Sequence, residues 1–395
     1  MIEAVSSAWD VVSAFLVLVF GATVALTTAM SLGTGQRRAL SLYAWHTIFC
    51  IVYLWYVMAY SGDAMGYFET AEVSFGEFNI GTQFVNFLTG LMVHGLRVSM
   101  LGAFLVFNIF GVVGLLAFDA SLRRAVHYKP KYFQRLATVI VFLPSVSFWS
   151  SAIGKDALSF MSTGLALWAC LSLNRRWQLM SFAILVMFLV RPHVAGMMVL
   201  GWTFAVFTAR QTRFNSRTFQ VGLVIAAAAI MVPFALQYVG LGQASNIEVF
   251  SDYVEQRQGY NMEGAGGIDI ASMSLPMQLF SYMFRPLFFE SASIFSLAAA
   301  VDNLILLYLF VLGVRAILRG RISCLGEGRV YMWSYGLLAW LLLSMTTANM
   351  GIALRQKWMF APMFIYLMLS VIGTHKPTLL PGKLAAPPVL ARDPA

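Results

Sequence analysis

Long apolar stretches recur along the whole chain and are separated by short polar segments. Most of them approach the roughly 20 residues that an α-helix needs to cross a bilayer. A backbone inside lipid must satisfy its own hydrogen bonds, so such stretches predict helices. The pattern indicates an all-α, polytopic membrane protein with about eleven transmembrane helices. The expected spans are 11–30, 40–60, 98–118, 136–151, 157–173, 178–190, 194–209, 219–240, 292–314, 330–347 and 358–373.

The composition agrees with this interpretation. Of the 395 residues, 59% are hydrophobic and only 11% are charged, which is more apolar than a soluble domain of this length requires. We expect one multi-spanning domain over 1–375, with outer loops 61–97 and 241–291. The tail 376–395 is rich in Pro and Ala, and we expect it to be disordered and cytoplasmic. Acidic rather than basic residues precede the first apolar stretch, so we expect that helix to be retained.

Basic residues gather in alternate loops, which is the positive-inside pattern. It predicts an outer N-terminus and a cytoplasmic C-terminus, and it explains the net charge of +9 without a nucleic-acid partner. A cation on the outer side, close to lipid, needs a partner. All but seven of the 26 Lys and Arg residues fall on the cytoplasmic side, and the exceptions are Arg97, Lys155, Arg191, Arg257, Arg285, Arg355 and Lys357.

Arg191 lies with Pro192 and His193 between two short apolar stretches. Fused into one helix, the two stretches would be on the order of 50 Å long, too long for a hydrocarbon core of about 30 Å. We therefore expect a hairpin of two short helices with Arg191 at its tip, in a cavity below the outer surface. The guanidinium would bind a phosphate group there or form a salt bridge to an outer carboxylate.

Segment 144–156 connects two expected spans on the outer side and reads PSVSFWSSAIGKD. Its small hydroxyl residues, its glycine and the Lys155-Asp156 pair predict a polar turn that opens a helix, with Asp156 in the first helical turn. One interpretation is phosphate binding by Lys155 and the helix N-terminus. The alternative is a capped helix start with a Trp and a Lys at the membrane interface.

Three further cations lie at expected outer helix ends. Arg285 lies in the segment FRPLFFE, where it would bind phosphate or simply pair with Glu290. Arg355 and Lys357 precede the last span in the segment NMGIALRQKW. They would contact phosphate, for which a guanidinium is well suited, or extend from the helix end toward the interface.

The first outer loop contains the segment GDAMGYFE, with Asp63 and Glu69. A carboxylate just outside a span is a candidate general base, although acidic outer loops are common without such a role. Cys50, Cys170 and Cys324 are too scattered for a metal site or a disulfide framework, and the five histidines lack ligand spacing. We expect no cofactor and no structural metal. A divalent cation stays an open alternative that the ligand spacing does not support.

These motifs together resemble bacterial exopolysaccharide and O-antigen polymerases of the Wzy type. The resemblance covers about residues 60–365 and rests on the turn Pro-Ser-x-x-Phe-Trp-Ser-Ser-x-x-x-Lys-Asp, an Arg-Pro pair, an outer Phe-Arg-Pro-Leu segment and a late Arg-x-Lys. The early Gly-Asp-x-x-x-Tyr loop is similar to the first outer loop of C-type glycosyltransferases, which use lipid-linked sugars. The large soluble outer domain that many of those enzymes carry is missing from this sequence.

The resemblance implies transfer of a glycan from undecaprenyl diphosphate to an acceptor sugar, at the outer face of the bacterial inner membrane. Cations would neutralise the departing diphosphate, and Lys155, Arg191, Arg285, Arg355 and Lys357 are the candidates. A base would take the acceptor proton; Asp63 is the first choice, and the others are Glu69, Asp156 and His193. The expected partners are the undecaprenyl-linked saccharide, membrane lipid and other polysaccharide-assembly proteins.

Two other functions fit the sequence. A transporter or flippase for lipid-linked saccharides would have internal repeats and charges at mid-membrane; repeats are not evident, and only Asp302 and His46 are candidates for such charges. A non-catalytic scaffold in an envelope polysaccharide assembly would tolerate changes at the outer arginines.

Overall fold

The computed structural model describes residues 7–208, 214–238, 272–291, 293–321 and 327–373, together with 255, 256, 258, 267 and 270. Within these residues the chain is helical, and the extended pairing is limited to an isolated bridge between Gly267 and Asn349. The expected tail 376–395 and most of the expected loop 241–291 lie outside the described residues.

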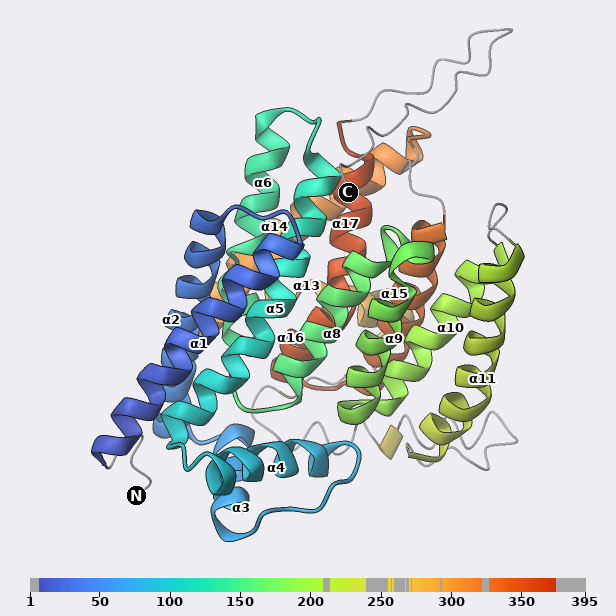
Figure 1. Ribbon diagram of the computed structural model, residues 1–395. Helices are drawn as coiled ribbons and strands as arrows, with labels where there is room; N and C mark the ends of the chain where they lie inside the picture. Colours follow the sequence, from blue (N-terminus) through green and yellow to red (C-terminus); the bar gives the residue numbers. More distant parts are fainter. Residues whose placement is uncertain are drawn as a thin grey trace, which may run out of the picture.

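The described helices form one bundle (Figure 1). They are α1 (Ala8–Ser31), α2 (Gln36–Tyr60), α3 (Asp63–Val73), α4 (Thr82–Gly90), η1 (Leu91–Gly95), α5 (Met100–Val126), α6 (Lys131–Val141), α7 (Pro144–Ser150), α8 (Lys155–Cys170), α9 (Leu173–Val190), α10 (Pro192–Thr208), α11 (Phe214–Tyr238), α13 (Leu275–Phe284), η2 (Phe288–Glu290), α14 (Ile294–Leu318), α15 (Glu327–Thr346), α16 (Met350–Gln356), η3 (Lys357–Met359) and α17 (Ala361–Val371).

Five of the described helices are long and apolar enough to cross a membrane: α1, α2, α5, α9 and α14. Shorter apolar helices span Pro192–Thr208, Val221–Gln237 and Ala361–Val371. The expectation of an all-helical chain with membrane-type helices is therefore confirmed for the part of the chain that the structure describes.

The outer surface of α1 is apolar. Phe15, Leu16 and Phe20 are exposed, with more than half of each side chain's surface accessible. Soluble proteins rarely leave a contiguous apolar face of this kind in water. Exposed apolar residues also cover parts of α2 and α14, which agrees with helices that face lipid.

Helix α5 forms the centre of the bundle and packs against α1, α2 and α8. Helices α5 and α8 lie in close contact near Gly114 and Gly164. A Cβ atom on Gly164 would overlap the backbone of Gly114, and one on Gly114 would overlap the backbone of Met161. Small residues allow membrane helices to approach this closely and to gain van der Waals contact.

The expected span 136–151 differs in the structure. It is divided into α6 and α7, and the residue before Pro144 has an extended backbone. The proline ring disfavours a helical conformation at Leu143, and proline has no N–H to continue the helix, so a new helix begins at Pro144. The break separates α7 and the turn that follows it from the preceding helix.

The expected outer loop 61–97 is folded into α3, α4 and η1. These short helices lie at the end of the bundle where α1 begins, here named the α3 end (Figure 1). The opposite end, named the α6 end, contains α6 and the last turn of α17. The two ends are joined by the long helices, so a residue's position along a helix tells which end it occupies.

Asp119 anchors the α6 end. It is fully buried on α5 and accepts hydrogen bonds from Arg38 Nη2 at 2.6 Å and from Arg123 Nε at 2.9 Å. Arg123 also contacts Thr34, after the end of α1. Two arginines that fit the positive-inside pattern therefore also join α1, α2 and α5.

Candidate functional site

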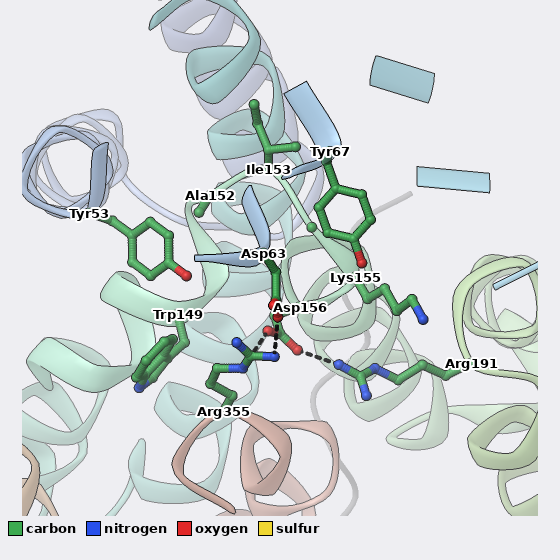
Figure 2. Close-up of a pocket in the computed structure, with 11 residues that line it drawn as sticks. Tyr53, Asp63, Tyr67, Trp149, Ala152, Ile153, Lys155, Asp156, Arg191 and Arg355 are labelled. Carbon is green, nitrogen blue, oxygen red and sulfur yellow. Dashed lines mark hydrogen bonds and ion pairs between the residues drawn. The ribbon is translucent and has the colours of Figure 1, made fainter. Parts of the chain in front are cut away.

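A small cavity lies at the α3 end (Figure 2), lined by residues of α2, α3, α7, α8 and α16, by the turn before α8 and by the break between α9 and α10. Its volume is about 140 Å³. The lining side chains combine three cations, two carboxylates and three aromatic rings. The cavity is lined by Tyr53, Asp63, Tyr67, Trp149, Ala152, Ile153, Gly154, Lys155, Asp156, Arg191 and Arg355.

Asp156 lies at the centre of the charged residues. It occupies the first turn of α8, where the helix dipole favours an anion. Its Oδ1 accepts a hydrogen bond from Arg191 Nη2 at 2.6 Å, and its Oδ2 lies 3.4 Å from Arg355 Nε. Each carboxylate oxygen therefore faces a different arginine, and Asp156 holds the two guanidinium groups on either side of itself.

Arg355 approaches the cavity from α16 and contacts both carboxylates. Its Nη2 donates a hydrogen bond to Asp63 Oδ2 at 2.9 Å, and its guanidinium lies 5.7 Å from the centre of the Trp149 ring. Burial alone would lower the pKa of Arg355, but the charges of Asp156 and Asp63 outweigh it and raise that pKa. Arg355 is thus a permanent cation, and an aromatic face adds a cation–π contact.

Arg191 lies at the break between α9 and α10. Its backbone is not helical because Pro192 follows it, and Pro192 begins the next helix. The residue is 8% exposed, and its buried Nε has no hydrogen-bond partner among the described residues. A buried donor of this kind needs an explanation, and a ligand anion in the cavity would supply the missing acceptor.

The start of α8 adds further donors to the cavity. Lys155 is the first residue of α8, and its side chain lines the cavity together with that of Arg191 (Figure 2). Gly154 precedes the helix and provides no side-chain cap. Backbone N–H groups in an uncapped first turn are suited to anions.

The two cavity carboxylates differ in exposure. The Asp63 side chain is 63% exposed, whereas that of Asp156 is 18% exposed. Asp63 Oδ2 accepts a hydrogen bond from Arg355, and its Oδ1 accepts none from the described residues. Of the two, Asp63 is the carboxylate that a molecule entering from outside would reach first.

Aromatic side chains complete the cavity. The rings of Tyr53 and Trp149 lie edge to face, 5.7 Å apart. Burial, followed by the charge of Asp63, raises the pKa of Tyr67 to about 12, so its phenol remains a hydrogen-bond donor at neutral pH. Aromatic faces and hydroxyl donors are the groups that a polar ring compound would contact in such a site.

Sequence reasoning did not single out Tyr53, and it placed Tyr67 in the Gly-Asp-x-x-x-Tyr motif without assigning a role to it. Tyr67 follows Asp63 by four residues, and this spacing places both on one face of a helix. The signal was therefore present, but segment 61–97 was expected to be a loop. For Tyr53, an aromatic residue in an apolar span, the sequence carries no signal that separates a lining residue from a packing residue.

The other residues singled out in the sequence do not line this cavity. Glu69 is exposed on α3, and His193 is half-buried on α10. Arg285 forms an ion pair with Glu290 at 2.7 Å. This pair is the alternative to phosphate binding that the sequence offered. Burial raises the pKa of Glu290, but hydrogen bonds from Arg285 and the Leu287 backbone outweigh it and lower that pKa.

Lys357 is fully buried, so its side chain does not reach the protein surface. Its ammonium donates to Asn303 Oδ1 on α14. It follows Arg355 by two residues, which on a helical turn places the two side chains on different faces. Of the five candidate cations, Lys155, Arg191 and Arg355 line one cavity, whereas Arg285 and Lys357 do not.

No group of three or more His, Cys, Asp or Glu side chains within the described residues is arranged to hold a metal ion. No protein-family model, curated protein or solved structure has significant similarity to this chain.

Proposed function

We propose that this chain is a glycosyltransferase of the polysaccharide-polymerase type, which acts on polyprenyl-diphosphate-linked saccharides. The observation that carries the proposal is the meeting of Lys155, Arg191 and Arg355 around one cavity that also holds an accessible carboxylate, Asp63. Diphosphate as a leaving group needs cations, and a hydroxyl acceptor needs a base.

In the proposed reaction, Asp63 accepts the proton of the acceptor hydroxyl while that oxygen attacks the anomeric carbon of the donor sugar. The bond between that carbon and the diphosphate oxygen breaks, and the electron pair leaves with undecaprenyl diphosphate. Arg191, Arg355 and Lys155 stabilise the charge that develops on this oxygen. Asp156 holds the two arginines in place and is therefore a positioning residue.

The cavity is large enough to enclose only part of the substrate. About 140 Å³ is well below the roughly 300–1,000 Å³ of sites that enclose a drug-sized ligand. It suits the reacting phosphate and its immediate neighbours. The remaining sugar units would extend outward past α3, and the polyprenyl chain would remain in lipid.

The proposal includes a topology. We place the chain in the bacterial inner membrane with about eleven spans, an outer N-terminus and a cytoplasmic C-terminus. The α3 end, with the cavity, then faces outward, and the α6 end faces the cytoplasm. This orientation agrees with Arg38 and Arg123 at the α6 end, as the positive-inside rule requires.

The test replaces Arg191 and Arg355 singly with Ala and follows polymer length in cells. Loss of one preorganised cation should reduce transfer about 100-fold or more. Arg285→Ala is the matched control, since Arg285 pairs with Glu290 away from the cavity, and it should leave the polymer unchanged. Membrane levels of each variant are measured by immunoblot. Normal polymer in both cavity variants, at normal protein levels, would contradict the proposal.

One observation favours a transporter of lipid-linked saccharides as the second candidate. Asp302, Asn303 and Lys357 are all fully buried between helices, and Asp302 Oδ2 accepts a hydrogen bond from the Ser145 backbone at 2.7 Å. Ionisable groups inside a membrane protein often mark a transport path. Under this alternative, Lys357→Met would abolish delivery of lipid-linked saccharide, and Arg191→Ala would not.

A further inference from the structure

A second cavity, larger and mostly apolar, lies between α13, α14 and α15. Its volume is about 630 Å³. On α14 it is lined by Leu307, Phe310, Val311 and Val314, and its inner wall is formed by Phe284 of α13 and Trp340 of α15. The rings of Phe284 and Phe310 lie 5.2 Å apart, and that of Trp340 lies 6.4 Å from Phe310. These contacts define an apolar groove.

The groove has the depth of one leaflet. From Leu307 to Arg319, α14 rises about 18 Å, compared with about 15 Å for half of a bilayer's hydrocarbon core. Val311 and Val314 are exposed along its open side. A flexible hydrocarbon chain of one leaflet would lie along it in contact with apolar side chains.

The groove ends at two arginines. Arg315 and Arg319 line it and are exposed at the last turn of α14. They are four residues apart, so they lie on one face of the helix. Neither forms an ion pair with another residue in the described part of the chain. The positive-inside pattern accounts for basic residues at this end, but not for their position at the mouth of an apolar groove.

The groove is separate from the cavity that contains Arg191. Phe295, near the start of α14, packs against Phe148 and Tyr56, close to that cavity. Arg315 follows Phe295 by twenty residues, which is about 30 Å along the helix. A donor lipid with its diphosphate at Arg191 therefore cannot place that phosphate at Arg315.

We propose that this groove binds an anionic glycerophospholipid. One acyl chain lies between α14 and α15 against Phe310 and Trp340, and the lipid phosphate contacts Arg315 and Arg319. A planar guanidinium pair suits a phosphodiester, and a net negative headgroup offsets part of the two positive charges. A bound lipid would also seal the gap between α14 and α15 on the side of the α6 end.

The test measures lipid binding to the full chain purified in detergent, by native mass spectrometry with phosphatidylglycerol or phosphatidylcholine added. We expect the unmodified chain to retain phosphatidylglycerol and to prefer it over phosphatidylcholine. The double variant Arg315→Gln/Arg319→Gln should weaken phosphatidylglycerol binding about 30-fold. Val311→Trp, which fills the groove, should weaken the binding of both lipids.

A charge-matched control is Arg37→Gln/Arg135→Gln, because both arginines are exposed at the α6 end and do not line the groove. It should bind phosphatidylglycerol like the unmodified chain. Size-exclusion chromatography and thermal unfolding check that each variant is folded.

Several results would overturn the proposal. Equal retention of the two lipids by the unmodified chain would exclude recognition of an anionic headgroup, and this arm needs no variant. Preferential displacement of phosphatidylglycerol by undecaprenyl phosphate would assign the groove to a polyprenyl lipid. Undiminished binding to folded Val311→Trp would exclude an acyl chain in the groove. None of these results depends on the transferase activity, so the groove and the proposed function fail separately.

Discussion

At the α3 end, ion pairs join single residues that are far apart in the sequence. Asp156 holds Arg191 and Arg355, and Arg355 also holds Asp63, which lies 292 positions earlier in the chain. The two carboxylates therefore have different environments and should have different roles. Asp63 is exposed and is the candidate base, whereas Asp156 orients the cations.

Conservative amide variants distinguish these roles. Asp63→Asn should lower kcat by about 10²- to 10⁴-fold, the usual contribution of a general base, with little change in KM for the lipid-linked donor. Asp156→Asn should raise the donor KM as well as lower kcat, because Arg191 loses its charged partner and Arg355 loses one of its two. Steady-state transfer with purified enzyme measures both values. Unchanged kcat in Asp63→Asn would exclude Asp63 as the base.

We expect the carboxylate of Asp119 to stabilise the fold. It is fully buried and paired with two arginines, so Asp119→Ala would leave Arg38 and Arg123 without their anion. Breaking a fully buried pair costs about 3–5 kcal/mol, and the cost should be smaller here because the side chains of Arg38 and Arg123 are 28% and 35% exposed. We expect a clear drop in the unfolding temperature in detergent, and little change for Glu72→Ala, an exposed carboxylate on α3. Equal unfolding temperatures for the two variants would rule out this anchoring role.

Proline and glycine residues interrupt the helices that surround the cavity. Pro144 separates α6 from α7, Gly154 precedes α8, and Pro192 follows the break at Arg191. The breaks at Gly154 and Arg191 place Lys155, Asp156 and Arg191 at the cavity. The break at Pro144 instead leaves the Ser145 N–H to donate a hydrogen bond to Asp302. The position of α8, which carries Lys155 and Asp156, depends in turn on its packing against α5.

Gly164→Ala tests that packing. Its methyl group would overlap the carbonyl oxygen of Gly114, so α5 and α8 would have to separate, at a cost of about 1–3 kcal/mol. Gly66→Ala is the control, because Gly66 lies on a short helix with open space around it, and alanine favours the helix there. Thermal unfolding compares the two, and a Gly164→Ala protein as stable as Gly66→Ala would contradict the close helix contact.

The molecule as a whole places different chemistry at its two ends. The α3 end contains the cavity with Asp63, Asp156 and their cations, and the α6 end contains Asp119 with its arginines and the groove that ends at Arg315. The long helices between these ends are apolar and face lipid over part of their surface. The orientation of the bundle in the membrane therefore decides which compartment each site faces.

Thiol labelling tests the proposed orientation. Glu69 and Tyr128 are exposed at the α3 end and the α6 end. In a Cys324→Ser background, a thiol reagent that does not cross the inner membrane should label Glu69→Cys in intact cells. It should label Tyr128→Cys only after the cells are permeabilised. Cys50 and Cys170 are buried and should remain silent. The reverse labelling pattern would invert the topology.

By itself, the sequence determined the helical, membrane-type character of the chain, because hydropathy is a property of contiguous residues. In lipid, the backbone N–H and C=O groups must form their hydrogen bonds within the same segment, which favours helices. The sequence also singled out Lys155, Arg191 and Arg355, since cations against the positive-inside pattern are visible without a fold. It named Asp63 and Asp156 as carboxylates in outer segments. The helices within 61–97 were missed because short polar helices lack a hydropathy signal.

Only the tertiary structure decided which of these charges meet. Arg285 forms an ion pair with Glu290, five residues later, whereas Lys357 is buried and donates a hydrogen bond to Asn303, 54 positions earlier. Arg355 reaches Asp63 across almost the whole chain. Ion pairs depend on distances of a few ångströms between separate helices, and helix packing sets these distances. The same packing brought Tyr53, Tyr67 and Trp149 to the cavity and left the apolar groove below Arg315.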